Sequence, residues 1–269
     1  GEARAQGQSV LIALLFAYLL VSLPLLNLHV ALAGYADLLA GLILLAALVS
    51  LYRARLLQSR RNLLLGVVLL LALVSVKNEG LFWAAAGLAG FAYSHLRSLR
   101  RRWLVLGLSA GVMLLVGVAA LDLQVAGHSL SNLQIIYRPA AGAARVEQSF
   151  GLGSWHLAVY LWVGAALCWP LIGPKSEALK ALARSLLLML LLYLVLFLFT
   201  RYAYGAVHFT ASGRIMLQLA PSFTFFSFLL FVQVWPSSQA RPPVPGVSDA
   251  PGHFLSGGGS GRSDPKGGR

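Results

Sequence analysis

Apolar residues recur along the chain in long runs that short polar segments interrupt. Eight such runs are visible, at residues 10–31, 36–52, 63–76, 81–95, 103–121, 155–173, 184–200 and 214–235. A helix needs about 20 predominantly apolar residues to cross the hydrocarbon core of a bilayer, and most of these runs approach that length. The pattern therefore predicts an all-α, polytopic membrane protein with about eight transmembrane helices.

The third and fourth runs are shorter than a full span, at 14 and 15 residues. Such helices could tilt, thin the bilayer locally, or pair so that the turn between them lies below the membrane surface. That turn is Lys77-Asn78-Glu79-Gly80 (KNEG), a polar tetrapeptide between two uncharged runs. It is either an ordinary polar turn or part of a site at the membrane surface.

Two segments stand outside the spans. Residues 122–154 form a connection that is too long for a simple turn; it either covers a site or is a passive surface loop, and residues 129–139 could lie in the interface as an amphipathic helix. Residues 236–269 are rich in Gly, Pro and Ser and predict a disordered cytoplasmic tail. We therefore expect a transmembrane domain at 1–235, incomplete at its N-terminus if a catalytic part precedes residue 1, followed by this tail.

Composition supports the membrane class, because 58% of residues are hydrophobic and only 11% are charged, against about 25% charged in soluble domains. The connections between the runs alternate between the two sides of the membrane. One set contains 16 of the 21 Lys and Arg, and the other set contains five, namely Lys77, Arg138, Arg145, Arg201 and Arg214. The positive-inside rule then predicts a multi-pass protein of a cell inner membrane with both termini cytoplasmic. Since this rule explains the net charge of +13, we expect no nucleic-acid partner.

This orientation gathers polar residues from separate segments at the extracytoplasmic face: Asp37, Lys77, Asn78, Glu79, Arg201, His208 and Arg214. Ionisable groups at membrane depth are costly, usually paired, and candidates for function. Each also has an ordinary explanation. Asp37 could favour a helix start, Lys77 and Glu79 could form a solvated turn or a mutual ion pair, and the arginines could be interfacial anchors. Their shared face predicts one common site.

Three motifs, taken in order, resemble a known family. They are GYADL at 34–38, KNEG at 77–80 and HFTASGRIMLQLAP at 208–221. Together they resemble bacterial multi-span glycosyltransferases of the GT-C superfamily, related to protein O-mannosyltransferases and to enzymes that add sugars to lipid A. The likeness covers about residues 34 to 222. It departs from the family pattern at Gly213, where those relatives carry an acidic residue.

The resemblance implies transfer of a sugar from a polyprenyl-phosphate donor to a lipid or glycan acceptor at the outer face of the bilayer. Lys77, Arg201 and Arg214 would hold the donor phosphate, and Asn78 and His208 would also bind substrate. Asp37 and Glu79 would orient Lys77 and the sugar, or act as general base. The family's usual acid in the first outer loop has no counterpart here, so we expect it before residue 1, or a chain inactive alone.

Other functions are compatible with the same charges. A transporter or flippase for a lipid-linked or polar solute would use them as a binding site, and a truncated, non-catalytic membrane scaffold would use them for folding. Inverted repeats would favour a transporter, and the sequence shows none. Cys168 is the single cysteine, so we expect no cysteine metal site and no cofactor, while a divalent cation stays open.

The charge distribution makes a topology prediction. A Gln58→Cys variant on a Cys168→Ser background should resist an impermeant thiol reagent added outside intact cells, because position 58 lies in an arginine-rich connection. Asn78→Cys on the same background should react. Labelling of position 58 from outside, with position 78 protected, would contradict the orientation.

Overall fold

The computed structural model describes residues 10–31, 36–95, 124–125, 128–129, 137–173, 176–200, 202–208 and 211–234. The chain divides into two units, Gly1–Pro236 and Ser237–Arg269. The second unit, which contains most of the predicted tail, lies outside the described residues, as does the predicted run 103–121. All statements below concern the described part of the first unit.

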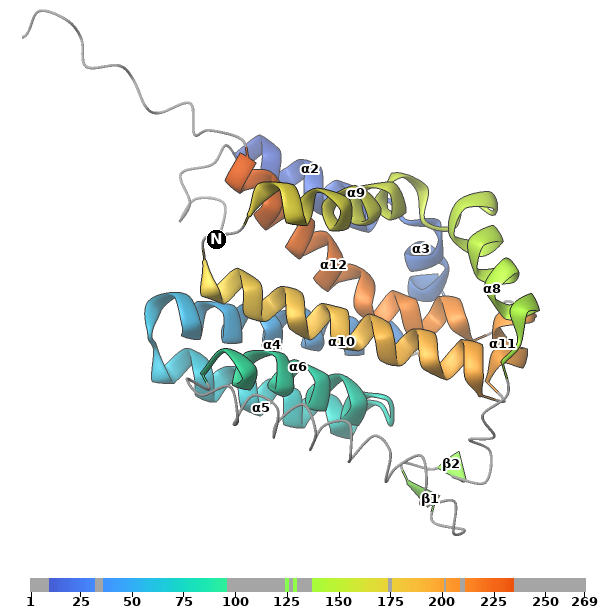
Figure 1. Cartoon of the computed structure of the whole chain (residues 1–269), viewed down its shortest axis with the longest axis horizontal. Coiled ribbons are helices and arrows are strands. Elements are labelled where there is room, and N and C mark those ends of the chain that lie inside the picture. Colours follow the sequence, from blue (N-terminus) through green and yellow to red (C-terminus); the bar gives the residue numbers. More distant parts are fainter. Residues whose placement is uncertain are drawn as a thin grey trace, which may run out of the picture. The chain divides into compact units, whose positions relative to one another are not determined.

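Helices make up almost all of the regular structure (Figure 1). They are α2 (Val10–Val21), α3 (Pro24–Ala31), α4 (Asp37–Leu57), α5 (Arg60–Val76), α6 (Gly80–His95), α8 (Pro139–Val146), the π-helical turn η2 (Glu147–Gly151), α9 (His156–Ile172), α10 (Glu177–Phe199), α11 (Ala203–Val207) and α12 (Ser212–Val234). The strands β1 (Gln124–Val125) and β2 (His128–Ser129) form one short antiparallel pair. The predicted all-α class is confirmed.

Three helices, α4, α10 and α12, are long and apolar enough to cross a membrane. Two bent pairs, α2 with α3 and α8–η2 with α9, raise the number to five if each pair is one span. This supports a multi-pass membrane protein. The run 10–31, predicted as one span, is two helices bent by 63°. Pro24 begins the second of them, since a proline fits the first helical position but not a helix interior.

Two helices extend beyond the apolar runs that predicted them. α4 continues to Leu57 and so includes Arg53 and Arg55, which the pattern places in a loop. α10 begins seven positions before the predicted 184, at Glu177. Cations are favourable near a helix C-terminus, and long charged side chains can lie along a helix with their heads in water. Hydrophobicity alone therefore underestimates the lengths of α4 and α10.

α4 is the central helix of the packing. It contacts α5, α10 and α12, while α6 packs on α10 and α5, and α9 packs on α12 (Figure 1). The main core contains large, fully buried side chains from these helices, among them Leu44, Leu48, Met189 and Phe197. A smaller cluster around Leu23, Trp155 and Trp162 lies against the other side of α12.

Glycines permit the closest helix contacts. A Cβ on Gly41 of α4 would lie 3.1 Å from the carbonyl oxygen of Gln218 in α12. A Cβ on Gly90 of α6 would lie 2.7 Å from the Cα of Ser185 in α10. The Ser185 hydroxyl donates a hydrogen bond to the carbonyl oxygen of Gly87, 3.0 Å away. Small residues at such crossings are typical of membrane helices, where packing drives association.

The charged residues lie at the two ends of α4. Asp37 begins the helix and Arg53 and Arg55 lie near its end. A helix of 21 residues is about 32 Å long, close to the thickness of the hydrocarbon core. Lys77 and Arg214 contact Asp37. They therefore lie at the opposite end of α4 from Arg53 and Arg55. The candidate site belongs to that end.

The α6–α10 contact predicts how two glycine substitutions differ. Gly90→Ala should lower the free energy of unfolding by about 1–3 kcal/mol, because the added methyl group meets the backbone of α10. Gly164→Ala in α9 is the control, since a Cβ there meets nothing within 4 Å, and should be neutral or slightly stabilising. Thermal unfolding in detergent measures both. Equal effects would contradict the packing.

Candidate functional site

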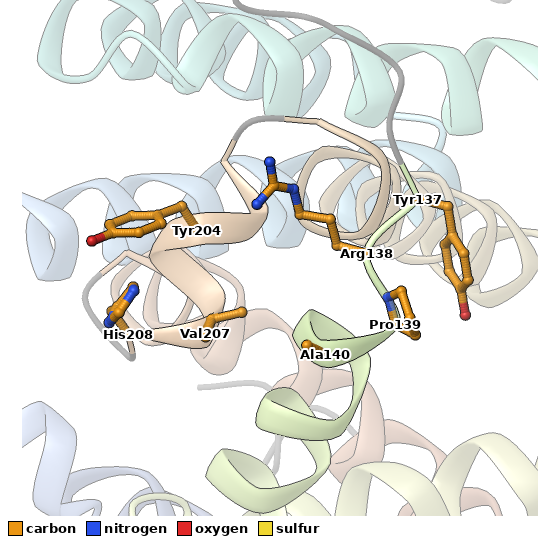
Figure 2. Close-up of a pocket in the computed structure, with 7 residues that line it drawn as sticks. All are labelled: Tyr137, Arg138, Pro139, Ala140, Tyr204, Val207 and His208. Atoms are coloured by element: carbon orange, nitrogen blue, oxygen red, sulfur yellow. The ribbon is translucent and has the colours of Figure 1, made fainter.

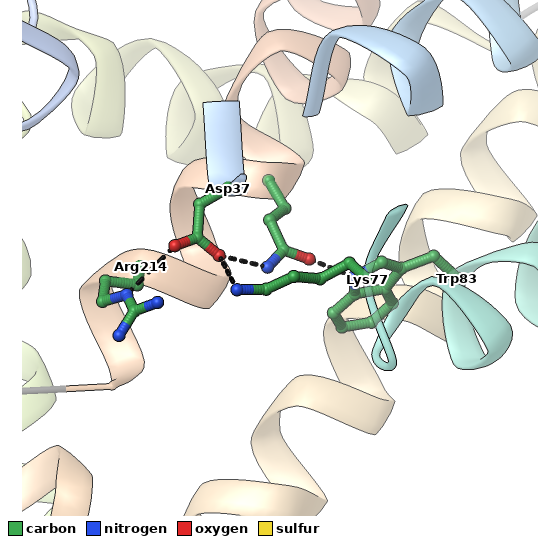
Figure 3. Close-up of polar contacts among 5 residues, drawn as sticks. Asp37, Lys77, Trp83 and Arg214 are labelled. Atoms are coloured by element: carbon green, nitrogen blue, oxygen red, sulfur yellow. Dashed lines mark hydrogen bonds and ion pairs between the residues drawn. The ribbon is translucent and has the colours of Figure 1, made fainter. Parts of the chain in front are cut away.

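Asp37 is buried in the first turn of α4, with 1% of its surface exposed. It does not cap the helix, because Ala36 is the N-cap residue and no side chain caps it. Its carboxylate oxygens instead bind side chains from other segments (Figure 3). Oδ1 lies 3.0 Å from Nζ of Lys77, and Oδ2 accepts a hydrogen bond of 3.0 Å from Nε of Arg214.

Gln218 donates a further hydrogen bond to this carboxylate. It lies one turn after Arg214 in α12, and its Nε2 donates to Oδ1 of Asp37 at 2.7 Å. Its Oε1 accepts from the indole Nε1 of Trp83 at 2.7 Å. Because an indole nitrogen only donates, Trp83 fixes the orientation of the amide. The network, named the Asp37 cluster below, comprises Asp37, Lys77, Trp83, Arg214 and Gln218.

The KNEG turn positions Lys77 for this contact. α5 ends at Val76, and the backbone of Lys77 is extended, so the chain turns sharply before α6. The carbonyl of Lys77 accepts from the Gly80 amide at 2.9 Å, and that of Glu79 accepts from the Trp83 amide at 3.2 Å. A Cβ on Gly80 would lie 2.8 Å from the carbonyl carbon of Leu73. The turn is tight because residue 80 has no side chain.

The other two polar residues of this turn lie differently. Asn78 is exposed and Glu79 is half-buried. Burial, and then the negative charge of Glu79, raise the pKa of Tyr202, which precedes α11. Tyr202 therefore stays a neutral phenol, and Glu79 lies near the connection between α10 and α11. Lys77 is paired with Asp37, so it is not simply a solvated turn residue.

A second set of polar contacts lies at the start of α12. The Ser212 hydroxyl donates to Oε1 of Gln148 at 2.7 Å, and the Tyr193 hydroxyl donates to the carbonyl of Ser212 at 3.3 Å. A Cβ on Gly213 would lie 2.7 Å from Nε2 of Gln148. Gln148, in η2 of the long connection, thus contacts the first turn of α12, while α8 packs on α11 and α10.

The remaining predicted site residues lie elsewhere. Arg201 is outside the described residues. The ring centre of His208 lies 4.1 Å from that of Tyr204, and both residues line an open cavity of about 440 Å³ between the start of α8 and α11. Figure 2 shows Arg138 extending over this cavity toward the side of Tyr204. His208 therefore lines this cavity and is not among the residues of the Asp37 cluster.

Comparisons with protein-family models, curated proteins and solved structures find no match. The resemblance of the three motifs is therefore not tested independently, and glycosyl transfer stays a prediction. Within the described ranges, no three His, Cys, Asp or Glu side chains gather in a way that could hold a metal ion.

Sequence reasoning selected Asp37, Lys77 and Arg214, and the structure brings these three into contact. It missed Gln218, which lies inside the third motif, and Trp83, which follows KNEG by three residues. The spacing of four between Arg214 and Gln218 places them on one helix face, and this signal could have identified the glutamine. Gln148 gives no comparable signal, because its contact depends on how the long connection folds back.

The burial of Asp37 predicts a large effect of removing its charge. Asp37→Asn should lower the free energy of unfolding by about 3–5 kcal/mol, because Lys77 and Arg214 lose their shared carboxylate in a buried site. Glu177→Gln is the control: Glu177 also pairs with a lysine, at 2.8 Å, but is 52% exposed, so its loss should cost at most about 1 kcal/mol. Denaturant unfolding in detergent compares them, and a neutral Asp37→Asn would refute the role of the carboxylate.

Proposed function

We propose that this chain is a multi-pass inner-membrane protein of about eight spans that takes part in sugar transfer at the extracytoplasmic face. The donor is a polyprenyl-phosphate sugar and the acceptor a lipid or glycan. One observation carries the proposal. The three segments that resemble GT-C glycosyltransferases, far apart in sequence, supply Asp37, Lys77 and Arg214 to a single buried ion cluster.

The charges of this cluster favour an anionic ligand. Asp37, Lys77 and Arg214 together carry a formal charge of +1, from one carboxylate and two cations. Lys77 is 19% exposed and Arg214 is 35% exposed, whereas Asp37 is buried. An ammonium group has three N–H donors and a guanidinium group has five, and Arg214 contacts Asp37 through Nε. A phosphate group suits both cations, since Arg and Lys bind phosphate by charge-assisted hydrogen bonds.

In the proposed reaction, the acceptor hydroxyl oxygen forms a bond to the anomeric carbon of the donor sugar. The bond from that carbon to the phosphate oxygen breaks, and its electron pair leaves with the phosphate. Lys77 and Arg214 stabilise the charge that develops on the leaving phosphate. The hydroxyl proton passes to a carboxylate base.

The two predicted catalytic carboxylates are suited to different roles. Both oxygens of Asp37 are engaged and its side chain is buried, so it orients Lys77 and Arg214. Glu79 is half-buried in the same turn as Lys77 and is the better placed of the two to contact the sugar or to accept a proton.

An apolar surface that suits a prenyl chain is present beside Lys77. α5 exposes a row of aliphatic side chains along its length, namely Leu64, Leu65, Val68, Leu71 and Val74. The row runs toward the end of α5, where Lys77 follows. In the proposal, a prenyl chain lies along this surface with its phosphate at Lys77.

The proposal predicts that Lys77→Gln lowers the rate of sugar transfer at least about a hundredfold, as expected when one donor to a developing negative charge is lost. Asp37 keeps Arg214 and Gln218, so the variant should still accumulate. Lys180→Gln is the control, since Lys180 contacts only the exposed Glu177 among the ion pairs of the described residues. Transfer is measured in membranes supplied with a lipid-linked donor.

Two outcomes would contradict this assignment. Transfer at the wild-type rate by Lys77→Gln would make Lys77 a structural residue of the turn. A wild-type protein that binds or translocates the lipid-linked sugar but does not transfer it to a supplied lipid or glycan acceptor would favour a flippase.

A further inference from the structure

Arg145 is a buried cation that the proposed reaction does not use. It lies in the last turn of α8, and 8% of its surface is exposed. Its guanidinium carbon lies 4.1 Å from the centre of the Tyr193 ring and 4.7 Å from that of Phe197, both on α10. Such stacking attracts a cation, but it satisfies none of the N–H groups at the guanidinium edge.

Two of its nitrogens, Nε and Nη2, are buried and have no hydrogen-bond partner among the described residues. A buried charge without hydrogen bonds is costly in free energy, so the burial of these two nitrogens requires an explanation. The N–H groups of Nε and Nη2 point the same way along one edge of the planar guanidinium. That edge forms parallel hydrogen bonds to two oxygens of a phosphate or carboxylate.

The surroundings of Arg145 also favour an anion. Gln148, one turn further along, is buried against Ser212 at the N-terminus of the 23-residue helix α12, and a helix N-terminus is electropositive. Glu147, the acid nearest in sequence, is exposed. The rings of Tyr193 and Phe197 hold the guanidinium plane, so its edge is oriented in advance for a bidentate ligand.

We infer that Arg145 is the centre of an anion subsite that binds a phosphoryl group through Nε and Nη2. The subsite is built on α8 and α10 and uses no residue of the Asp37 cluster, and its existence does not depend on sugar transfer. Because both nitrogens are buried, the ligand enters when the 139–151 segment moves away from α10. The π-helical turn η2 in this segment is a feature that often occurs at functional sites.

The test is phosphate binding by the full chain in phosphatidylcholine nanodiscs. Inorganic phosphate is titrated against chloride at matched ionic strength, and binding is followed as stabilisation against heat. A second arm uses nanodiscs that contain polyprenyl phosphate. Saturable binding in the first arm identifies a soluble phosphate as sufficient, and binding in the second arm alone identifies a lipid phosphate.

Arg145→Lys keeps the charge but removes the bidentate edge, so it should weaken binding at least about tenfold. Arg184→Lys is the matched control, because Arg184 also stacks on a ring, that of Tyr93, yet already has Glu177 as a neighbour; it should bind as the wild type does. No saturable binding in either arm, or equal losses in both variants, would overturn the inference.

A measurement on the unmodified protein decides the matter if Arg145→Lys does not fold. Phenylglyoxal modifies arginines, and peptide mass spectrometry locates the products. Phosphate should protect Arg145 from modification and leave Arg184 unprotected. Equal modification of Arg145 with and without phosphate, or no reaction at Arg145 under any condition, would contradict a subsite that phosphate can enter.

Discussion

The buried carboxylate of Asp37 is the constraint on which the site end of the structure depends. A carboxylate held out of water is tolerated only with full hydrogen bonding and a compensating charge. Its two oxygens contact Lys77, Arg214 and Gln218, and these side chains come from two segments, the turn after α5 and the first turns of α12. The tight turn between α5 and α6 brings Lys77 to this carboxylate, α12 brings Arg214 and Gln218, and Trp83 orients the Gln218 amide.

The described basic residues that depart from the positive-inside pattern each make a specific polar or ring contact or line a cavity. Five of 21 lie on the predicted outer side. Lys77 and Arg214 bind Asp37, Arg145 is buried against two rings, and Arg138 lines a cavity. Cations on this side do not help to orient the protein in the membrane, so their presence needs a local reason. In each described case the structure supplies one.

The sequence was sufficient for the membrane class and for the contact among Asp37, Lys77 and Arg214, because polar residues in apolar surroundings are informative wherever they occur. It could not give the bend between α2 and α3 or the true ends of α4 and α10, since hydropathy does not report where charged residues continue a helix. The position of Gln148 was also out of reach. Its contact with Ser212 depends on the folding of a long connection, and no periodic pattern specifies that.

The central claim is that the Asp37 cluster binds the phosphate of a lipid-linked sugar donor. An electron cryomicroscopy structure of the full chain in nanodiscs with polyprenyl phosphate tests it most directly. The account predicts phosphate density within hydrogen-bonding distance of both Lys77 and Arg214, with Asp37 still bound to them and the prenyl chain along α5. A bound lipid whose phosphate lies away from both cations, with the cluster unchanged, would contradict it and leave Asp37 a purely structural ion-pair centre.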